Sequence, residues 1–369
     1  MENLFTIYKT IFNDNNWKYY GNLYVNPFAS NESSKNFIKN FIKLSGKDAG
    51  NQLYERIEDL KDEMRIKHIV STFFLGIYLY NNISTIKESV DKIVSRYQGK
   101  IQAEACRQGV NVDIQFSFFW YLICLFHDLG YVIEKSEYYD SFESFIKKQK
   151  IKYCLWKQQS RGIPLFYKKI FANYFAYRLK NKDDRIKGTD HGIAGGIILF
   201  DDLKRILKKE LKNKNQHESN ESGLYWGKDL VLIFNLTSWV ILSHNIYYTK
   251  SNNETKNRYE ANNLNELILK DRKKKISMKR HPFLFLFSLV DSIEPIKVFE
   301  EYNELEKFEI ECENDKIIIR IQDEELFNKY SENIEGKKDD ENGMSLKDWL
   351  VSDVQVNKSK NDLRIEIKL

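Results

Sequence analysis

The chain has 369 residues, of which 42% are hydrophobic and 14% aromatic; this is enough for a substantial core and excludes a mainly disordered protein. Its 58 basic and 53 acidic residues leave a net charge of only +5, which does not by itself indicate nucleic-acid binding. The four cysteines contain no C-x-x-C pair, so a reduced intracellular protein is favoured over a disulfide framework or a thiolate zinc site.

Residues 1–60 are expected to form a helical N-terminal extension with polar breaks rich in Asn and Ser. The first residues, Met1-Glu2-Asn3-Leu4-Phe5, lack the basic start and apolar stretch of a signal peptide, so we expect a cytoplasmic protein. The longest apolar runs are about half of the ~20 residues that are needed to cross a bilayer. No membrane partner is therefore expected.

Residues 61–303 are expected to form a helical domain, and apolar residues at helical spacing predict its elements. The first strong helix is expected from about Leu53 to Tyr80, the second at 85–108 and the most hydrophobic at 114–129. Gly130 follows that helix directly and suggests a C-terminal cap. Residues 132–188 are polar and aromatic, and we expect them to form an insertion of two or three helices, one from Phe166 to Leu179.

Three further helices are expected at 191–212, 229–246 and 282–302. The side chain of Thr189 or Asp190 is expected to cap the first of them. Gly195 and Gly196 within it would allow a neighbouring helix to approach closely.

Residues 304–369 are expected to form a small α+β subdomain, because the hydrophobic period changes. Phe308, Ile310 and Cys312 alternate with glutamates at a period of two, and a turn at Asn314-Asp315 leads into a second strand at 316–322. Short helices near 324–332 and 345–351 and strands near 353–357 and 362–368 complete this part.

Metal-ligand residue types stand at the ends of the apolar stretches of the helical domain. They are His68, His127-Asp128 after 118–126, His191, His244 after 239–243, and Asp291 after 283–290. A carboxylate or imidazole in a helix core is costly unless something compensates it, and one shared metal centre would compensate all of them. Imidazole nitrogens and carboxylate oxygens suit divalent Mn, Fe, Co, Ni, Zn or Mg. We therefore predict a divalent metal centre with one or two ions.

The ordered set, with F-H-D-L-G-Y at its centre and L-V-D-S-I-E-P at its end, resembles the HD-domain superfamily of metal-dependent phosphohydrolases. The resemblance implies a mainly α fold, an HD-domain-like helical bundle. It implies a first ion held by His68, His127, Asp128 and Asp291, and a second ion at His191 and His244 with Asp128 bridging. Asn245 stands where some branches carry a second histidine, and Tyr131 where a lysine often follows.

The resemblance also implies that a metal-activated water cleaves a phosphate ester or phosphodiester of a nucleotide-like substrate. Asp128 and His191 are the predicted catalytic residues: Asp128 holds and orients the water, and His191 stabilises the phosphate or the second ion. Arg65, close to one helical turn before His68, and Asn245 are the predicted substrate-binding residues. The G-Y-P phosphodiesterase branch is not indicated, because Val132 follows Gly130-Tyr131.

Two other functions stay open at this point. One is an HD-type nuclease acting on single-stranded DNA or RNA. The basic run 271–280 could attract a polyanion, whereas the balanced charge and the lack of an evident aromatic and basic platform count against this reading. The other is a non-catalytic nucleotide-sensing module that signals through the C-terminal sheet, which the departures at Tyr131 and Asn245 motivate. The oligomeric state is left open.

Overall fold

A computed structural model of the chain describes residues 63–107, 109, 114–131, 133, 139–157, 167–180, 190–213, 227–250, 255–269, 275–299, 302–335, 346–359 and 362–369. The expected N-terminal extension 1–60 lies outside the described residues. So do residues 271–274 of the basic run, Thr189, and parts of the expected insertion 132–188.

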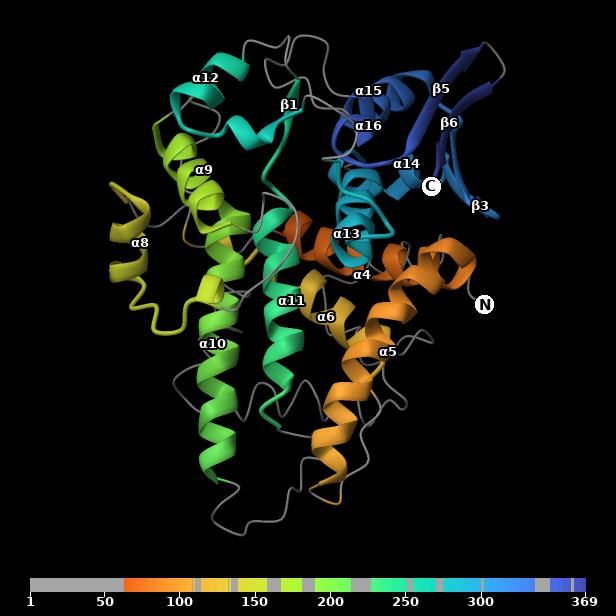
Figure 1. Cartoon of the computed structure of the whole chain (residues 1–369). Helices are drawn as coiled ribbons and strands as arrows, with labels where there is room; N and C mark the ends of the chain where they lie inside the picture. Colours follow the sequence, from red (N-terminus) through yellow and green to blue (C-terminus); the bar gives the residue numbers. More distant parts are fainter. Residues whose placement is uncertain are drawn as a thin grey trace.

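A helical body makes up most of the described chain (Figure 1). Its elements are α4 (Glu63–Asn82), α5 (Ser84–Cys106), α6 (Phe116–Phe126), α10 (His191–Asn213), α11 (Leu230–Ser243) and α13 (Pro282–Ile293). Helix α10 packs along α11, α11 contacts α6, and α4 contacts both α6 and α13. Helix α6 is buried over almost its whole length, as its unbroken apolar sequence predicts. The prediction of a mainly α protein is confirmed at this level.

Helix α13 is shorter than predicted. The sequence indicated a helix over 282–302, but α13 ends at Ile293, and Glu294 is extended with ψ 120°. Pro295 explains the difference, because proline disfavours the helical conformation of the residue before it. The 3-10 turn η7 (Pro295–Lys297) and the short helix α14 (Tyr302–Leu305) follow. This break turns the chain back toward α4, which η7 contacts.

The expected insertion contains α8 (Phe142–Lys148), the 3-10 turn η2 (Leu155–Lys157) and α9 (Lys168–Lys180) among the described residues. The helix predicted over 166–179 is therefore present with slightly shifted ends. Four elements between α11 and α13 were not predicted: β1 (Thr249–Lys250), α12 (Thr255–Ala261), η5 (Asn265–Leu267) and β2 (Ile268–Leu269). Strands β1 and β2 pair in parallel but are too short to give a period of two.

Two glycines permit the close contacts that bring the ends of α6, α10 and α11 together. The prediction that Gly130 caps α6 is wrong, since the cap position is His127 and Gly109 is the one glycine with positive φ among the described residues. A Cβ on Gly130 would instead lie 1.9 Å from the carbonyl oxygen of His191. A Cβ on Gly196 would lie 2.6 Å from the carbonyl oxygen of Ser238, as expected for a glycine at a close helix contact.

The C-terminal part contains the predicted strands, which form a small antiparallel sheet. Its strands are β3 (Phe308–Glu313), β4 (Lys316–Ile321), β5 (Asp353–Ser359) and β6 (Asp362–Lys368), in the order β3-β4-β6-β5. The helices α15 (Glu324–Glu335) and α16 (Leu346–Trp349) accompany the sheet. The register pairs Ile317 with Ile367 and Ile319 with Ile365, so that these four buried isoleucines share one face.

The sheet and the helical body share one continuous hydrophobic core. Phe299, just after η7, contacts Phe308 on β3 and stacks on Tyr330 of α15. The hydroxyl of Tyr330 donates to the carbonyl oxygen of Ile293, at 2.5 Å. The C-terminal part is thus anchored at the end of α13. Within the described residues, no helix combines the length and apolar character needed to traverse a lipid bilayer.

Candidate functional site

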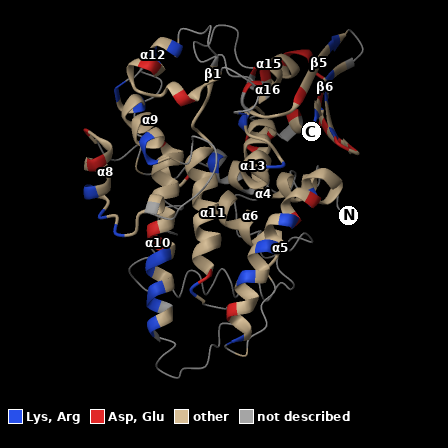
Figure 2. Ribbon diagram, viewed as in Figure 1, with Lys and Arg blue, Asp and Glu red and all other residues tan. Residues whose placement is uncertain are grey.

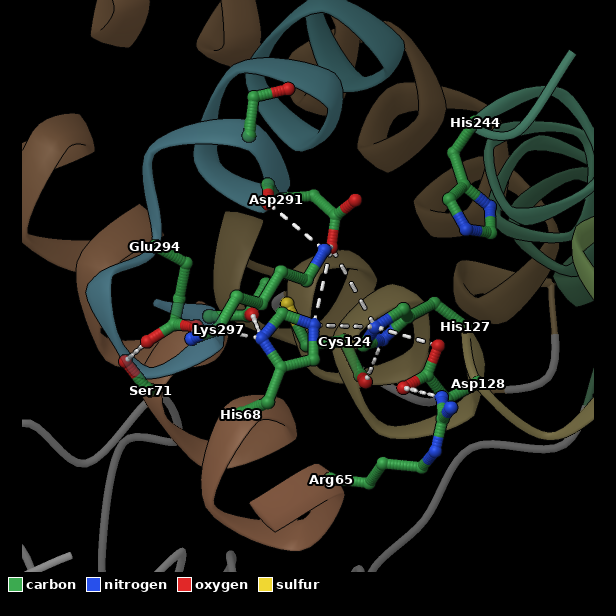
Figure 3. A network of polar contacts seen from close by, with 12 residues as sticks. Arg65, His68, Ser71, Cys124, His127, Asp128, His244, Asp291, Glu294 and Lys297 are labelled. Atoms are coloured by element: carbon green, nitrogen blue, oxygen red, sulfur yellow. Dashed lines mark hydrogen bonds and ion pairs between the residues drawn. The ribbon is translucent and has the colours of Figure 1, made fainter. Parts of the chain in front are cut away.

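Side chains from widely separated segments converge inside the helical body (Figure 3). His68 projects from α4, His127 follows α6, and Asp291 lies in the last turn of α13. One potential ligand atom from each of these three residues lies within 4.8 Å of the other two. The Nε2 atom of His68 is 3.2 Å from His127 Nε2 and 3.2 Å from Asp291 Oδ1. The three predicted ligands therefore form one compact group.

The hydrogen bonds of the Nδ1 atoms of His127 and His68 determine which atoms of the three residues are left to bind an ion. His127 Nδ1–H donates to the carbonyl oxygen of Cys124 at 2.8 Å, and His68 Nδ1–H donates to the carboxylate of Glu294 at 2.8 Å. Because both partners accept, a neutral ring in each case leaves an unprotonated Nε2. Two bare nitrogens and the carboxylate of Asp291 then face one another without a proton between them. A shared cation resolves this conflict, so the donor set fits a divalent metal ion.

Asp128 lies between this group and a second histidine. Its Oδ1 atom is 3.2 Å from His127 Nε2 and 3.9 Å from His191 Nε2. Although burial acts to raise the pKa of Asp128, the neighbouring His127 and His68 lower it below its ordinary value. The carboxylate is consequently ionised at neutral pH and could serve both sides of the site, which is the bridging position that the resemblance implies.

His191 and His244 form the far side of the site. Their ring centroids are 5.2 Å apart, and Figure 3 shows His244 set back from the first group. His244 Nδ1–H donates to the carbonyl oxygen of Ile241 at 2.6 Å, which is the same three-residue spacing as between His127 and Cys124. Burial holds the pKa of His191 well below its ordinary value. A neutral His191 is therefore available as a nitrogen donor, and the hydrogen bond at Nδ1 of His244 leaves its Nε2 as the nitrogen that could bind an ion.

The ionisation of His127 and Asp291 also suits metal binding, whereas at His68 an ion would have to replace a proton. Burial lowers the pKa of His127 to about 4. Burial and the nearby Lys297 act to lower the pKa of His68, but its hydrogen bonds with Asp291 and Glu294 raise it overall. Burial opposes ionisation of Asp291, yet the charge of Lys297 and the bond with His68 hold its pKa well below the ordinary value. His127 is thus neutral, and Asp291 ionised, at neutral pH.

A cavity of about 630 Å³ opens onto these groups. It is lined by His68, Asp128, His191, His244 and Asp291, together with Arg65, Tyr131, Asn245, Tyr247, Ile296 and Lys297. Every predicted site residue except His127 thus borders one cavity, whose size is in the usual range of small-molecule sites.

Arg65 is held over this cavity by stacking. Its guanidinium carbon lies 3.4 Å above the centre of the Tyr131 ring, and that ring stacks on His191 with centroids 3.8 Å apart. Arg65 Nη1 is also 3.6 Å from Asp128 Oδ2. The residue predicted to bind substrate is therefore positioned at the site.

Glu294 was not predicted as a functional residue, although it belongs to the quoted L-V-D-S-I-E-P motif. It is buried and accepts a hydrogen bond from Ser71 as well as from His68. The backbone N–H groups of Ile296 and Lys297 also donate to its carboxylate, at 2.8 and 3.2 Å. Glu294 therefore ties the turn after α13 to the orientation of His68. The only sequence signal was a carboxylate before a proline at the end of an apolar helix.

Lys297 is a second group that the sequence did not indicate. Its Nζ atom lies 2.6 Å from Asp291 Oδ1 and 3.0 Å from the Asp291 carbonyl oxygen. The turn at Pro295 is what returns this lysine to the end of α13. Lys297 adds a positive charge on the side of the site opposite the pair of Arg65 and Asp128.

Asp190 supports the predicted residue Asn245. Its Oδ1 accepts from the backbone N–H of Ile193 at 2.9 Å, which confirms the predicted cap of α10. Its Oδ2 accepts from the side-chain amide of Asn245 at 2.8 Å. Asn245 borders the cavity, but its amide nitrogen points at Asp190, so it also forms part of the support of the site.

No protein-family model, no curated protein and no solved structure matches this chain. What the site can do follows from its own donor atoms and charges.

Proposed function

We propose that the chain is a metal-dependent phosphohydrolase of the HD type that cleaves a phosphate ester or phosphodiester of a nucleotide-like substrate. One observation carries the proposal: potential ligand atoms of His68, His127 and Asp291 lie within 4.8 Å of one another. The opposite nitrogens of both rings are held by Glu294 and the Cys124 carbonyl oxygen.

The donor set determines which ion fits. Imidazole nitrogens combined with carboxylate oxygens favour a first-row divalent ion or Mg²⁺ over Ca²⁺, which prefers sites built of oxygen ligands. Asp128 would complete the first set, and His191 and His244 would hold a second ion. When bound, the ion supplies an activated water and offsets negative charge on the phosphoryl oxygens.

Four side chains have the other proposed roles in the reaction. Asp128 holds and orients the attacking water, and His191 stabilises the phosphate or the second ion. Arg65 and Lys297 are paired with Asp128 and Asp291. We propose that these two cations move onto the phosphate oxygens when substrate binds, because the metal then offsets the charges of the two carboxylates.

The test is hydrolysis of a phosphoester panel by chelator-treated protein that has been reloaded with Mn²⁺. The panel contains nucleoside mono-, di- and triphosphates, cyclic nucleotides and a chromogenic phosphodiester. We expect turnover that requires the ion and falls by roughly 10²–10⁴ in Asp128→Ala. Asp323→Asn removes a half-buried carboxylate on the C-terminal part and should leave the rate unchanged. Absence of turnover on the whole panel would contradict the proposal.

A nuclease acting on single strands is the second candidate. The observation in its favour is the basic and aromatic surface on α8, η2, α9 and α10 that is described below. Incubation of the Mn²⁺-loaded protein with labelled single-stranded DNA or RNA separates the two candidates: shortened products identify the nuclease, and intact strands leave the small phosphoester as substrate.

A further inference from the structure

The expected insertion carries a second cavity, of about 520 Å³, that none of the proposed ligands borders. Its lining includes Trp156, one acid, Glu143, and the lysines Lys147, Lys150, Lys152 and Lys168. The side chains of Lys150 and Lys152 are exposed. This part of the surface therefore combines several cations with an aromatic wall.

The loop that bears these lysines is fixed to α10. Asp201 is buried and accepts from the backbone N–H groups of Lys152 and Tyr153, at 2.9 and 2.6 Å. Arg205 donates to Asp201 at 2.7 Å and to the carbonyl oxygen of Lys150 at 2.7 Å. The backbone positions of the lysines are thus set in advance, which lowers the entropy that binding would cost.

The positive charge continues onto α10, whose C-terminal half carries most of its basic residues (Figure 2). Lys208 Nζ lies 4.7 Å from the centre of the Tyr153 ring, which joins the helix to the loop. Residues 140–156, 167–169 and 201–212 contain eleven Lys and Arg against five Asp and Glu. This excess of six positive charges makes the surface strongly basic.

The aromatic side chains of the same surface are spaced among the lysines. Lys168 Nζ lies 5.3 Å from the centre of the Trp156 ring. Tyr167, next to it, is 51% exposed and is the one large exposed hydrophobic residue among those described. Rings beside cations are the pattern that binds unstacked bases together with phosphates.

We infer that this surface, formed by α8, the loop after it, η2, the start of α9 and the C-terminal half of α10, binds single-stranded nucleic acid. The lysines contact the phosphates, and Trp156, Tyr153 and Tyr167 offer faces for the bases. Duplexes are disfavoured because their bases are already stacked. The inference does not depend on the proposed phosphohydrolase activity, since it uses neither the first cavity nor a metal ion.

The experiment measures fluorescence anisotropy of labelled oligo(dT) and oligo(U) of about 16 nucleotides, with a duplex of equal length and anionic lipid vesicles as competitors. Chelator is present, so that hydrolysis does not interfere. We expect single strands to bind more tightly than the duplex. If about four phosphates are contacted, a fourfold increase in salt should weaken binding roughly fiftyfold.

Two variants test the surface itself. Lys150→Glu with Lys152→Glu should weaken binding more than about tenfold, and Trp156→Ala about tenfold, the value expected for one lost base stack. The matched control is Lys92→Glu with Lys100→Glu, which makes the same charge change at exposed positions of α5. Circular dichroism establishes that each variant is folded, and Mn²⁺-dependent phosphoester turnover should be unchanged in all of them.

Three outcomes would overturn the inference. They are no binding of single strands at low salt, equal weakening by the α5 pair, and displacement of the labelled strand far more readily by anionic vesicles than by an added unlabelled single strand. The last outcome would assign the surface to a membrane. Because turnover is measured separately, failure of this inference and failure of the proposed function are distinguishable.

Discussion

At the residue scale, Glu294 holds His68 in the orientation that the proposed metal site requires. Glu294→Gln keeps the size of the side chain but removes the negative charge of the carboxylate that accepts a hydrogen bond from His68 Nδ1–H. Loss of such a supporting carboxylate should weaken Mn²⁺ binding by roughly 10–100-fold, measured by competition with a chromophoric chelator. Glu309→Gln, on the exposed side of β3, is the control. An unchanged affinity in Glu294→Gln would show that His68 is not held in this way.

Lys297 offers a test of a different kind, because it competes with the metal for Asp291. Lys297→Met removes the cation that lies 2.6 Å from Asp291 Oδ1. We expect tighter Mn²⁺ binding together with a lower kcat/KM, since the phosphate loses a positive partner. Lys307→Met breaks a comparable pair with the half-buried Asp323 and should change neither quantity. Weaker metal binding in Lys297→Met would contradict the assigned competition.

At the scale of elements, glycines set the distances between helices. Gly196→Ala would place a Cβ 2.6 Å from the Ser238 carbonyl oxygen and 2.7 Å from the backbone nitrogen of Leu242, so α10 and α11 would have to separate. We expect a loss of about 1–3 kcal/mol in the free energy of unfolding in urea. Gly99→Ala in α5 meets nothing within 4 Å and should instead stabilise the protein by about 0.5–1 kcal/mol. Equal effects at the two positions would contradict the close helix contact.

Comparison of the predicted and observed elements shows which boundaries the hydrophobic periodicity of the sequence predicts and which it does not. The helices around His127 and His244 and the strands of the C-terminal sheet were predicted to within a few residues, because their burial follows a regular period. The end of α13 was not predicted correctly, since the apolar residues continue past the point where Pro295 stops the helix. Gly130 was misjudged for a related reason: its role is a contact with His191, about sixty residues away in the sequence.

At the scale of the whole molecule, buried histidines make stability depend on pH. Burial lowers the pKa of both His127 and His281 to about 4, from 6.5. Above pH 6.5 His127 and His281 are largely unprotonated in both the folded and the unfolded state. Between pH 6.5 and about 4 the unfolded state binds protons that the folded state does not, so the metal-free protein should lose stability as the pH falls through this window. The raised pKa of His68 acts in the opposite direction and reduces the loss.

Thermal denaturation at several pH values, with Mn²⁺ and with chelator, measures this effect. Mn²⁺ should raise Tm at neutral pH by mass action, and the gain should shrink in acid because protons compete for the imidazoles. His281→Asn removes one buried histidine outside the site and should make the pH dependence shallower while the gain from Mn²⁺ is kept. A gain from Mn²⁺ that is equally large at all pH values would argue against histidine ligands.

The sequence alone indicated which residue types stand at the ends of apolar helices, that the chain is mainly helical, and that strands follow the helices from Phe308 onward. These features are local, because periodicity reports which face of an element is buried. The tertiary structure was needed to show that Glu294 and Lys297 return to His68 and Asp291. It alone brought the lysines of 147–152 beside those of α10, about fifty residues further on. Such contacts depend on how helices pack in three dimensions, which no spacing along the chain encodes.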